Sequence, residues 1–333
     1  MASLSSWRDG WKRVLAAPAI AAGVFAMTIL MALPLAVTMR RAIASHLGDS
    51  VAAETAATGV NYDWWQEFAS SGGLGTTLSP GITGFATVLD NISRVLDART
   101  PVAPLAATLG LYVAGWAFLS GGILDRYARQ RPIRANGFFA ASGVHVFRFL
   151  RLAALAGAMY WWLFAYLHPW LFEVQFVNLT RDMTVERDAF AVRLLLYAAF
   201  GILLVATGLV VDYTKVRIVV EDRRSVLGAV TAALRFVRSH PIQVMALYAL
   251  NSLTFVAVLA VWALLAPGAG GAGLSMWTLF LGAQLYIAAR LLLKLQFMSS
   301  QVALFQRNLA HASYVAAPPA MWAESPAAEA IRG

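Results

Sequence analysis

Residues 242–265 read IQVMALYALNSLTFVAVLAVWALL, an apolar run that contains no Asp, Glu, Lys or Arg. A helix needs about 20 apolar residues to cross a hydrocarbon core of roughly 30 Å, so this run predicts a transmembrane helix. Five further runs have the same character and lie at 18–39, 104–124, 150–172, 190–211 and 276–297. The sequence therefore predicts an all-α fold, a polytopic transmembrane helical bundle of about six spans. We expect one membrane domain over 1–311, followed by a disordered cytoplasmic tail over 312–333 that is rich in Ala and Pro.

The composition also favours a membrane protein. Hydrophobic residues make up 59% of the chain and charged residues only 13%, whereas soluble domains carry about a quarter charged residues. The formal net charge is +9, but the basic residues gather in the connections between spans, where they suit anionic lipid better than nucleic acid. The chain contains no cysteine, which excludes disulfides, thiolate metal sites and cysteine nucleophiles.

The connections between the spans alternate in charge. Segment 42–103 and the connection between the third and fourth spans are net acidic, whereas the segments before span one, after span two and after span four are rich in Arg and Lys. Because positive residues mark the cytoplasmic side, we expect both termini in the cytoplasm. Arg40 and Arg41 lie on the wrong side of this pattern. The excess of Arg over Lys is typical of a GC-rich bacterial genome, so the expected location is a bacterial inner membrane.

Three short amphipathic stretches, 6–15, 144–151 and 230–238, lead into the odd-numbered spans. Apolar and basic residues interleave at helical spacing in each, which predicts interfacial helices in a three-fold tandem repeat of one such helix and two spans. The basic side chains of these helices would contact lipid phosphates. They are Arg13, Arg148, Arg151, Arg235 and Arg238. Alternatively, the stretches are only positively charged flanks of the spans.

Residues 211–222, Val-Asp-Tyr-Thr-Lys-Val-Arg-Ile-Val-Val-Glu-Asp, precede an amphipathic Arg-bearing stretch that enters the fifth span. This pattern resembles a group of six-span bacterial membrane proteins of unknown function, which includes the membrane domain attached to some glycerophosphodiester phosphodiesterases. The resemblance covers the last half of the chain best and implies a membrane domain. It does not imply the hydrolase, because the His-Arg-Gly catalytic motif of that enzyme does not occur here.

Segment 42–103 is long for a connection and is predicted to lie outside the cytoplasm. It contains a cluster of aromatic and acidic residues, which we consider a candidate recognition patch for an envelope protein, a peptide or a sugar. The patch consists of Asp63, Trp64, Trp65 and Glu67. Alternatively, the tryptophans anchor the segment at the headgroup level. A paired-carboxylate catalytic site is disfavoured, because one loop does not supply the cleft that glycoside hydrolysis needs. A helix with one apolar face is predicted over 79–96.

Few polar residues fall inside the apolar runs or at their ends. The candidates for an intramembrane cluster are Asp125, Asp212, Asn251, Gln284 and Arg290. An ion pair of Arg290 with Asp212 or Asp125 would mark a site inside the bundle. Alternatively, Arg290 and Lys294 extend to the interface. The sequence has no glycine-rich phosphate loop, no His-Glu-x-x-His, no Gly-x-Ser-x-Gly and no histidine cluster, so we predict no catalytic residue, no metal and no cofactor.

Three functions remain open from the sequence. The first is a non-enzymatic membrane protein that acts through contacts with membrane lipids or with a membrane or envelope protein partner. The second is a transporter or channel subunit, for which an internal repeat is typical, although charge at mid-depth is scarce. A water-accessible path lined by Asn251, Gln284 and Arg290 would favour it. The third, a membrane-embedded lipid enzyme, would need a nucleophile or a metal set.

Overall fold

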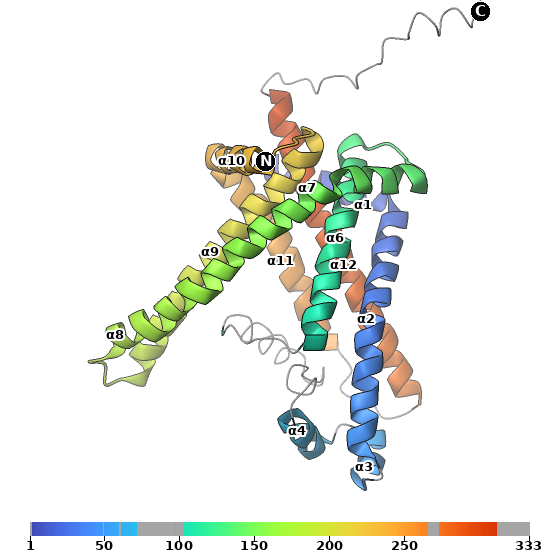
Figure 1. Cartoon of the computed structure of the whole chain (residues 1–333), viewed down its shortest axis with the longest axis vertical. Coiled ribbons are helices and arrows are strands. Elements are labelled where there is room, and N and C mark those ends of the chain that lie inside the picture. The colour runs from blue at the N-terminus through green and yellow to red at the C-terminus, as the bar shows by residue number, and fades with distance from the viewer. Residues whose placement is uncertain are drawn as a thin grey trace, which may run out of the picture.

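A computed structural model describes residues 2–48, 50–59, 61–71, 97, 103–265 and 273–311, and in these residues every regular element is a helix (Figure 1). The long helices are α2 (Pro18–Leu47), α6 (Ala103–Arg129), α7 (Ala135–Trp162), α9 (Glu186–Val220), α11 (Pro241–Leu265) and α12 (Leu274–His311). The short ones are α1 (Ala2–Leu15), α3 (Ala52–Thr58), α4 (Tyr62–Ser70), α8 (Phe176–Thr180) and α10 (Val226–Ser239). Two π-helical segments, η2 (Leu163–Leu167) and η3 (Trp170–Gln175), connect α7 to α8.

Six helical segments are long and apolar enough to cross a membrane. They are Pro18–Leu47, Leu105–Arg129, Ala135–Thr180, Glu186–Val220, Pro241–Leu265 and Leu274–Leu309. Lipid offers no hydrogen-bond partner to the backbone, whereas an α-helix satisfies its N–H and C=O groups internally. Apolar runs of this length therefore fold as helices in a membrane. The prediction of an all-α polytopic bundle with six spans is confirmed. The predicted helix over 79–96 and the tail over 312–333 lie outside the described residues.

The predicted three-fold repeat is not confirmed, because only two of the three amphipathic stretches form separate helices. The first and third stretches become α1 and α10, and a proline opens the long helix after each of them, Pro18 and Pro241. Residues 144–151 instead lie inside α7, which runs without a break from Ala135. Proline lacks the N–H that continues a helix, and no proline interrupts residues 144–151. The chain breaks earlier, around Pro132, between α6 and α7.

The helices α1 and α10 lie at the same end of the bundle (Figure 1), which we call the basic end. The connection between α6 and α7 is also found there. The basic side chains of these three segments include Arg8, Lys12, Arg13, Arg131, Arg134, Arg235 and Arg238, and Arg129 ends α6 beside them. The helices α3 and α4, with Glu54, Asp63 and Glu67, lie at the opposite end. This segregation agrees with the alternating charge of the connections in the sequence.

The helix α1 packs closely on α12. A Cβ atom added at Gly10 would lie 2.8 Å from Gln296 Oε1 and 2.9 Å from Ser300 Cβ, so only glycine permits this approach. Ser299 donates a hydrogen bond to the Gly10 carbonyl at 3.0 Å, and Gln296 donates one to the Trp7 carbonyl at 2.7 Å. The short helix before the first span is therefore fixed to the last span by polar contacts.

A second close approach joins α6 and α7. A Cβ atom at Gly122 would lie 2.8 Å from the carbonyl oxygen of Phe138 and 2.5 Å from Ser142 Oγ. Small residues allow membrane helices to pack with their backbones near each other, which provides van der Waals attraction where lipid offers no hydrophobic driving force. The contact fixes α7 against α6 near the basic end, while the rest of α7 runs beside α9, away from α2 (Figure 1).

Candidate anion-binding cavity

A cavity of about 910 Å³ lies between the long helices. All six contribute to its wall: Thr28 from α2, Tyr112 and Trp116 from α6, Leu152 and Tyr160 from α7, Asp212 and Lys215 from α9, Tyr248 from α11, and Arg290, Lys294 and Gln301 from α12. Most of the remaining wall is aliphatic or aromatic. A volume of this size is in the upper part of the range for small-molecule sites.

Lys294 is held by aromatic rings. Its Nζ lies 3.5 Å from the centroid of the Trp116 ring and 4.9 Å from that of Tyr112. The ammonium is also 3.5 Å from Tyr112 Oη, the limit of a hydrogen bond. Aromatic faces attract a cation through their quadrupole, and the attraction grows when the cation is desolvated. These rings hold Lys294 in place without neutralising its charge.

Asp212 is the one acid among the described residues that line the cavity, and its carboxylate already accepts two hydrogen bonds. Oδ1 accepts a hydrogen bond from Lys215 Nζ at 2.8 Å, and Oδ2 accepts one from Gln301 Nε2 at 3.3 Å. The two charges of the Lys215–Asp212 pair compensate each other. Asp212 therefore does not balance the other cations of the cavity.

The ion pair of Arg290 with Asp212 or Asp125, one of the two alternatives from the sequence, does not form. The Arg290 guanidinium lies 5.6 Å from the ring centroid of Tyr286 and 5.9 Å from that of Phe255. Asp125 instead pairs with Arg129 on its own helix at 2.7 Å. Both acids have basic neighbours three or four residues along the same helix, and these local partners are closer than Arg290.

The structure does not bring the predicted polar cluster together. Of its five residues, Asp212 and Arg290 line the cavity and the other three do not. Asn251 is buried between α11 and α12, where its side chain donates a hydrogen bond to Ser300 Oγ at 2.9 Å. Gln284 is half-buried on α12 and lies outside the cavity wall. A path lined by Asn251, Gln284 and Arg290 together, which would have favoured a transporter, is therefore not formed, and the cavity is lined by a different set of side chains.

The charge of the cavity is positive. Its wall carries Lys215, Arg290 and Lys294 against Asp212. Within the part of the chain that the structure describes, neither Arg290 nor Lys294 makes an ion pair. The indole Nε1 of Trp116, a residue only 7% exposed, also finds no acceptor there. The Trp116 nitrogen is itself buried, so it is the two cations without an acidic partner, on an apolar wall, that suit an anion with an apolar portion.

The five arginines predicted to contact lipid phosphates fall into two groups. Arg13 and Arg148 are engaged within the protein: Arg13 donates to the Tyr127 carbonyl at 3.0 Å, and Arg148 pairs with Asp222 at 2.5 Å. The other three are exposed at the basic end and remain available to phosphates. They are Arg151, Arg235 and Arg238.

The tryptophans of the predicted recognition patch are partly used inside the protein. Trp64 donates a hydrogen bond from Nε1 to His46 Nδ1 at 3.1 Å, and its ring stacks on Phe68 at 5.4 Å between centroids. Trp65 also packs against Phe68, at 5.5 Å. These contacts attach α4 to the end of α2 and support the anchoring interpretation. Asp63 and Glu67 remain exposed.

Sequence reasoning missed most of the cavity. Trp116, Tyr112 and Gln301 carry no signal in their local sequence. Lys294 does carry one, because it lies one helical turn from Arg290 in an apolar run, although the sequence alone is equally compatible with an interfacial position. Among the described residues, no three His, Asp or Glu side chains are placed to hold a metal ion.

Comparisons of this chain with models of protein families, with curated proteins and with solved structures match none of them.

Proposed function

We propose that this chain is a non-enzymatic protein of the bacterial inner membrane whose cavity binds an anionic lipid. The observation that carries the proposal is the pair Lys294 and Arg290, two cations without an acidic partner among the described residues, on the wall of a largely apolar cavity. Lys294 is half-buried, whereas Arg290 is exposed. A charge inside a membrane bundle, such as that of Lys294, is costly and generally marks a functional site. A lipid with a charged headgroup supplies both the missing anion and an apolar portion.

The geometry supports a headgroup site near the basic end. Asp212 and Lys215 precede Arg217 on α9 by less than two turns, and Arg217 pairs with Glu221 where that helix ends. In the proposed orientation both termini and the basic end face the cytoplasm, where Arg and Lys are enriched and anionic lipids are common. The headgroup would then lie beside Lys294, with the acyl chains along the apolar wall.

The test is native mass spectrometry of the full-length protein, purified in mild detergent and mixed with equal amounts of phosphatidylglycerol and phosphatidylcholine. The wild-type protein is expected to retain phosphatidylglycerol preferentially. Replacing the ammonium with an uncharged chain of similar length, Lys294→Met, removes a charge-assisted contact, which contributes about 1.5–3 kcal/mol. The affinity of the cavity site for phosphatidylglycerol should therefore fall at least about tenfold.

The matched control is Arg193→Met, which removes a cation from α9 at a position that does not line the cavity. It should leave retention unchanged, and a second cavity variant, Arg290→Met, should lower it. Equal retention by the wild-type protein and Lys294→Met would refute the proposal, as would a wild-type protein that carries no anionic lipid.

A transporter subunit is the second candidate. The observation that favours it is the size of the cavity and the contribution of all six long helices to its wall, since movement of any of them would change access. Liposomes that contain the protein should then pass a labelled anionic lipid between leaflets faster than empty liposomes. If the protein binds the lipid but does not speed its transfer between leaflets, the lipid-binding function is supported and the transporter function is refuted.

A protein partner at the opposite end is a further proposal. Its support is the exposed pair Asp63 and Glu67, one turn apart on α4. Co-purification from the native membrane is the test, with the double variant Asp63→Asn, Glu67→Gln as the comparison. A stoichiometric protein that is lost from the double variant would support a partner, and an unchanged preparation would remove it.

A further inference from the structure

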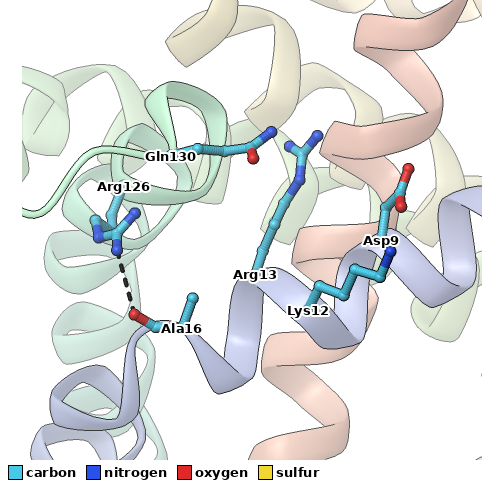
Figure 2. Close-up of a pocket in the computed structure, with 6 residues that line it drawn as sticks. All are labelled: Asp9, Lys12, Arg13, Ala16, Arg126 and Gln130. Carbon is cyan, nitrogen blue, oxygen red and sulfur yellow. Dashed lines mark hydrogen bonds between the residues drawn. The ribbon is translucent and has the colours of Figure 1, made fainter.

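A second, separate pocket lies at the basic end, where α1, its turn into α2 and the end of α6 meet. Figure 2 shows its six lining residues, Asp9, Lys12, Arg13, Ala16, Arg126 and Gln130. Its volume is about 350 Å³, and it shares no lining residue with the cavity between the spans. The pocket lies where α2 begins and α6 ends, and it is open to its surroundings.

Two guanidinium groups of this pocket are fixed by the protein itself. Arg13 donates hydrogen bonds to the Tyr127 carbonyl at 3.0 Å and to Gln306 Oε1 at 2.9 Å. Arg126 donates to the Ala16 carbonyl at 3.3 Å, the bond drawn in Figure 2. Partial burial lowers the pKa of the Arg13 guanidinium from its ordinary value, because the charged form loses hydration, but an arginine stays charged. A ligand therefore meets cations that need no further ordering, which favours binding.

Asp9 compensates only part of this positive charge. Its carboxylate pairs with Arg307 at 2.8 Å, and Arg307 lies on α12, outside the pocket. Lys12 is exposed and makes no ion pair in the part of the chain that the structure describes. With Asp9 paired with Arg307, the ammonium of Lys12 is left without an ion pair. Arg13 and Arg126 each use part of their guanidinium group on protein acceptors, but they keep their charge and further N–H donors for an anion.

Gln130 adds a neutral donor at the rim. Its backbone has φ of +52°, in the left-handed region, and its N–H donates to the Arg126 carbonyl at 3.0 Å, so that it ends α6. In Figure 2 its side-chain amide points toward the Arg13 guanidinium. Basic pockets between spans at the cytoplasmic side suit the headgroups of anionic lipids, and several charged donors around one small volume suit a phosphate group.

We propose that this pocket binds a phosphate group between α1 and α6, supplied by the headgroup of an anionic lipid or by a soluble phosphate compound. The bound group would connect Lys12 and Arg13 on α1 with Arg126 on α6. It would thereby hold the N-terminal helix against the second span. This role is independent of the lipid proposed for the cavity between the spans.

The experiment uses the delipidated full-length protein and measures two ligands separately. Native mass spectrometry follows retention of phosphatidylglycerol against phosphatidylcholine, and calorimetry follows inorganic phosphate. The test variant is Lys12→Gln, and the matched control is Arg8→Gln, which removes an exposed charge from the same helix, one turn away and outside the pocket. A Lys or Arg near a membrane surface contributes about 1 kcal/mol, so Lys12→Gln should weaken binding about fivefold and Arg8→Gln should not.

The outcomes separate the two sources of phosphate. A fivefold loss for phosphatidylglycerol alone assigns a lipid headgroup, and a fivefold loss for inorganic phosphate assigns a soluble compound. The proposal is overturned if neither ligand binds, or if Lys12→Gln and Arg8→Gln weaken binding equally, which would mean unspecific surface charge. Lys294→Met, which alters only the other cavity, should leave the Lys12-dependent binding intact, so the two proposals fail separately.

Discussion

The two amphipathic helices at the basic end, α1 and α10, are alike in sequence pattern and differ in how they are attached. Each has 14 residues and precedes a proline that opens a long helix. Polar contacts hold α1 on α12: carbonyls of α1 accept hydrogen bonds from Gln296 and Ser299, and Asp9 pairs with Arg307. Apolar contacts hold α10, whose Phe236 lies 5.1 Å from the rings of both Tyr213 and Phe305.

This difference shows that an amphipathic pattern predicts an element but not its attachment. The small face of α1, around Gly10, allows close backbone approach, so its contacts depend on geometry. The face of α10 is larger and buries Ala229, Ala233 and Phe236, so its contacts depend on buried area. Substitutions at matched positions of the two helices should therefore lower the free energy of unfolding by different amounts.

The largest effect is expected from Phe236→Ala in α10. The ring is 5% exposed and packs between α9 and α12, so its removal leaves a cavity and should lower the free energy of unfolding by about 3–5 kcal/mol. Leu234→Ala in the same helix is the control, because Leu234 is exposed, and its cost should stay below about 1 kcal/mol. Reversible unfolding in mixed detergent micelles measures both. Similar costs would show that α10 is not held by its apolar face.

An intermediate effect is expected from Gly10→Ala in α1. The new methyl group would meet Gln296 and Ser300 at less than 3 Å, and such overpacking costs about 1–3 kcal/mol. Gly228→Ala in α10 is the matched change, because there the added Cβ would lie 3.4 Å from its nearest neighbour, Ser225 Oγ.

The measurement is limited proteolysis at Arg8 and Lys12 together with the unfolding midpoint. Gly10→Ala should expose α1 to trypsin and lower the midpoint, whereas Gly228→Ala should leave it unchanged or slightly higher, because Ala favours helix. If both variants behave alike, α1 does not depend on close packing with α12.

The smallest effect is expected from Arg307→Gln. Its ion pair with Asp9 is about one third exposed, and such pairs contribute about 0.2–1 kcal/mol. Arg238→Gln in α10 is the comparison, because Arg238 is exposed and makes no ion pair among the described residues. Unfolding at low and high salt distinguishes them: only the cost of Arg307→Gln should shrink as salt rises. If the loss of unfolding free energy in Arg307→Gln is the same at low and high salt, Arg307 stabilises the protein through its hydrogen bonds and not through its charge.

The sequence was sufficient to predict the membrane spans, but it was not sufficient to predict where the chain breaks between helices. A run such as 242–265 has only one structure available in lipid, so its helix was predictable. The separate interfacial helix expected at 144–151 was not found, because basic residues alone do not end a helix. Pro18 and Pro241 do end the preceding helices, and a stricter use of proline would have distinguished the three stretches.

The site was less predictable than the fold for a physical reason. Lys294 and Trp116 are far apart in the sequence, and their contact depends on how α12 packs against α6. Nothing in the local pattern around Trp116 fixes that packing. The pairing of Arg290 with Asp212 or Asp125 was one of two alternatives from the sequence, and it considered charge without distance. Nearer basic residues on their own helices pair with the two acids instead.

The length of the third and fourth spans has a consequence for the lipid environment. The helical segment Ala135–Thr180 has 46 residues, of which the 28 of α7 alone correspond to about 42 Å, and the 35 residues of α9 correspond to about 52 Å. The hydrocarbon layer is roughly 30 Å thick. In Figure 1 the two run obliquely to α2 and α6. Helices longer than the layer adjust by tilting, so a thicker bilayer lets this pair stand more upright. Because Leu152, Tyr160 and Asp212 belong to the pair, we expect bilayer thickness to change the space beside Lys294.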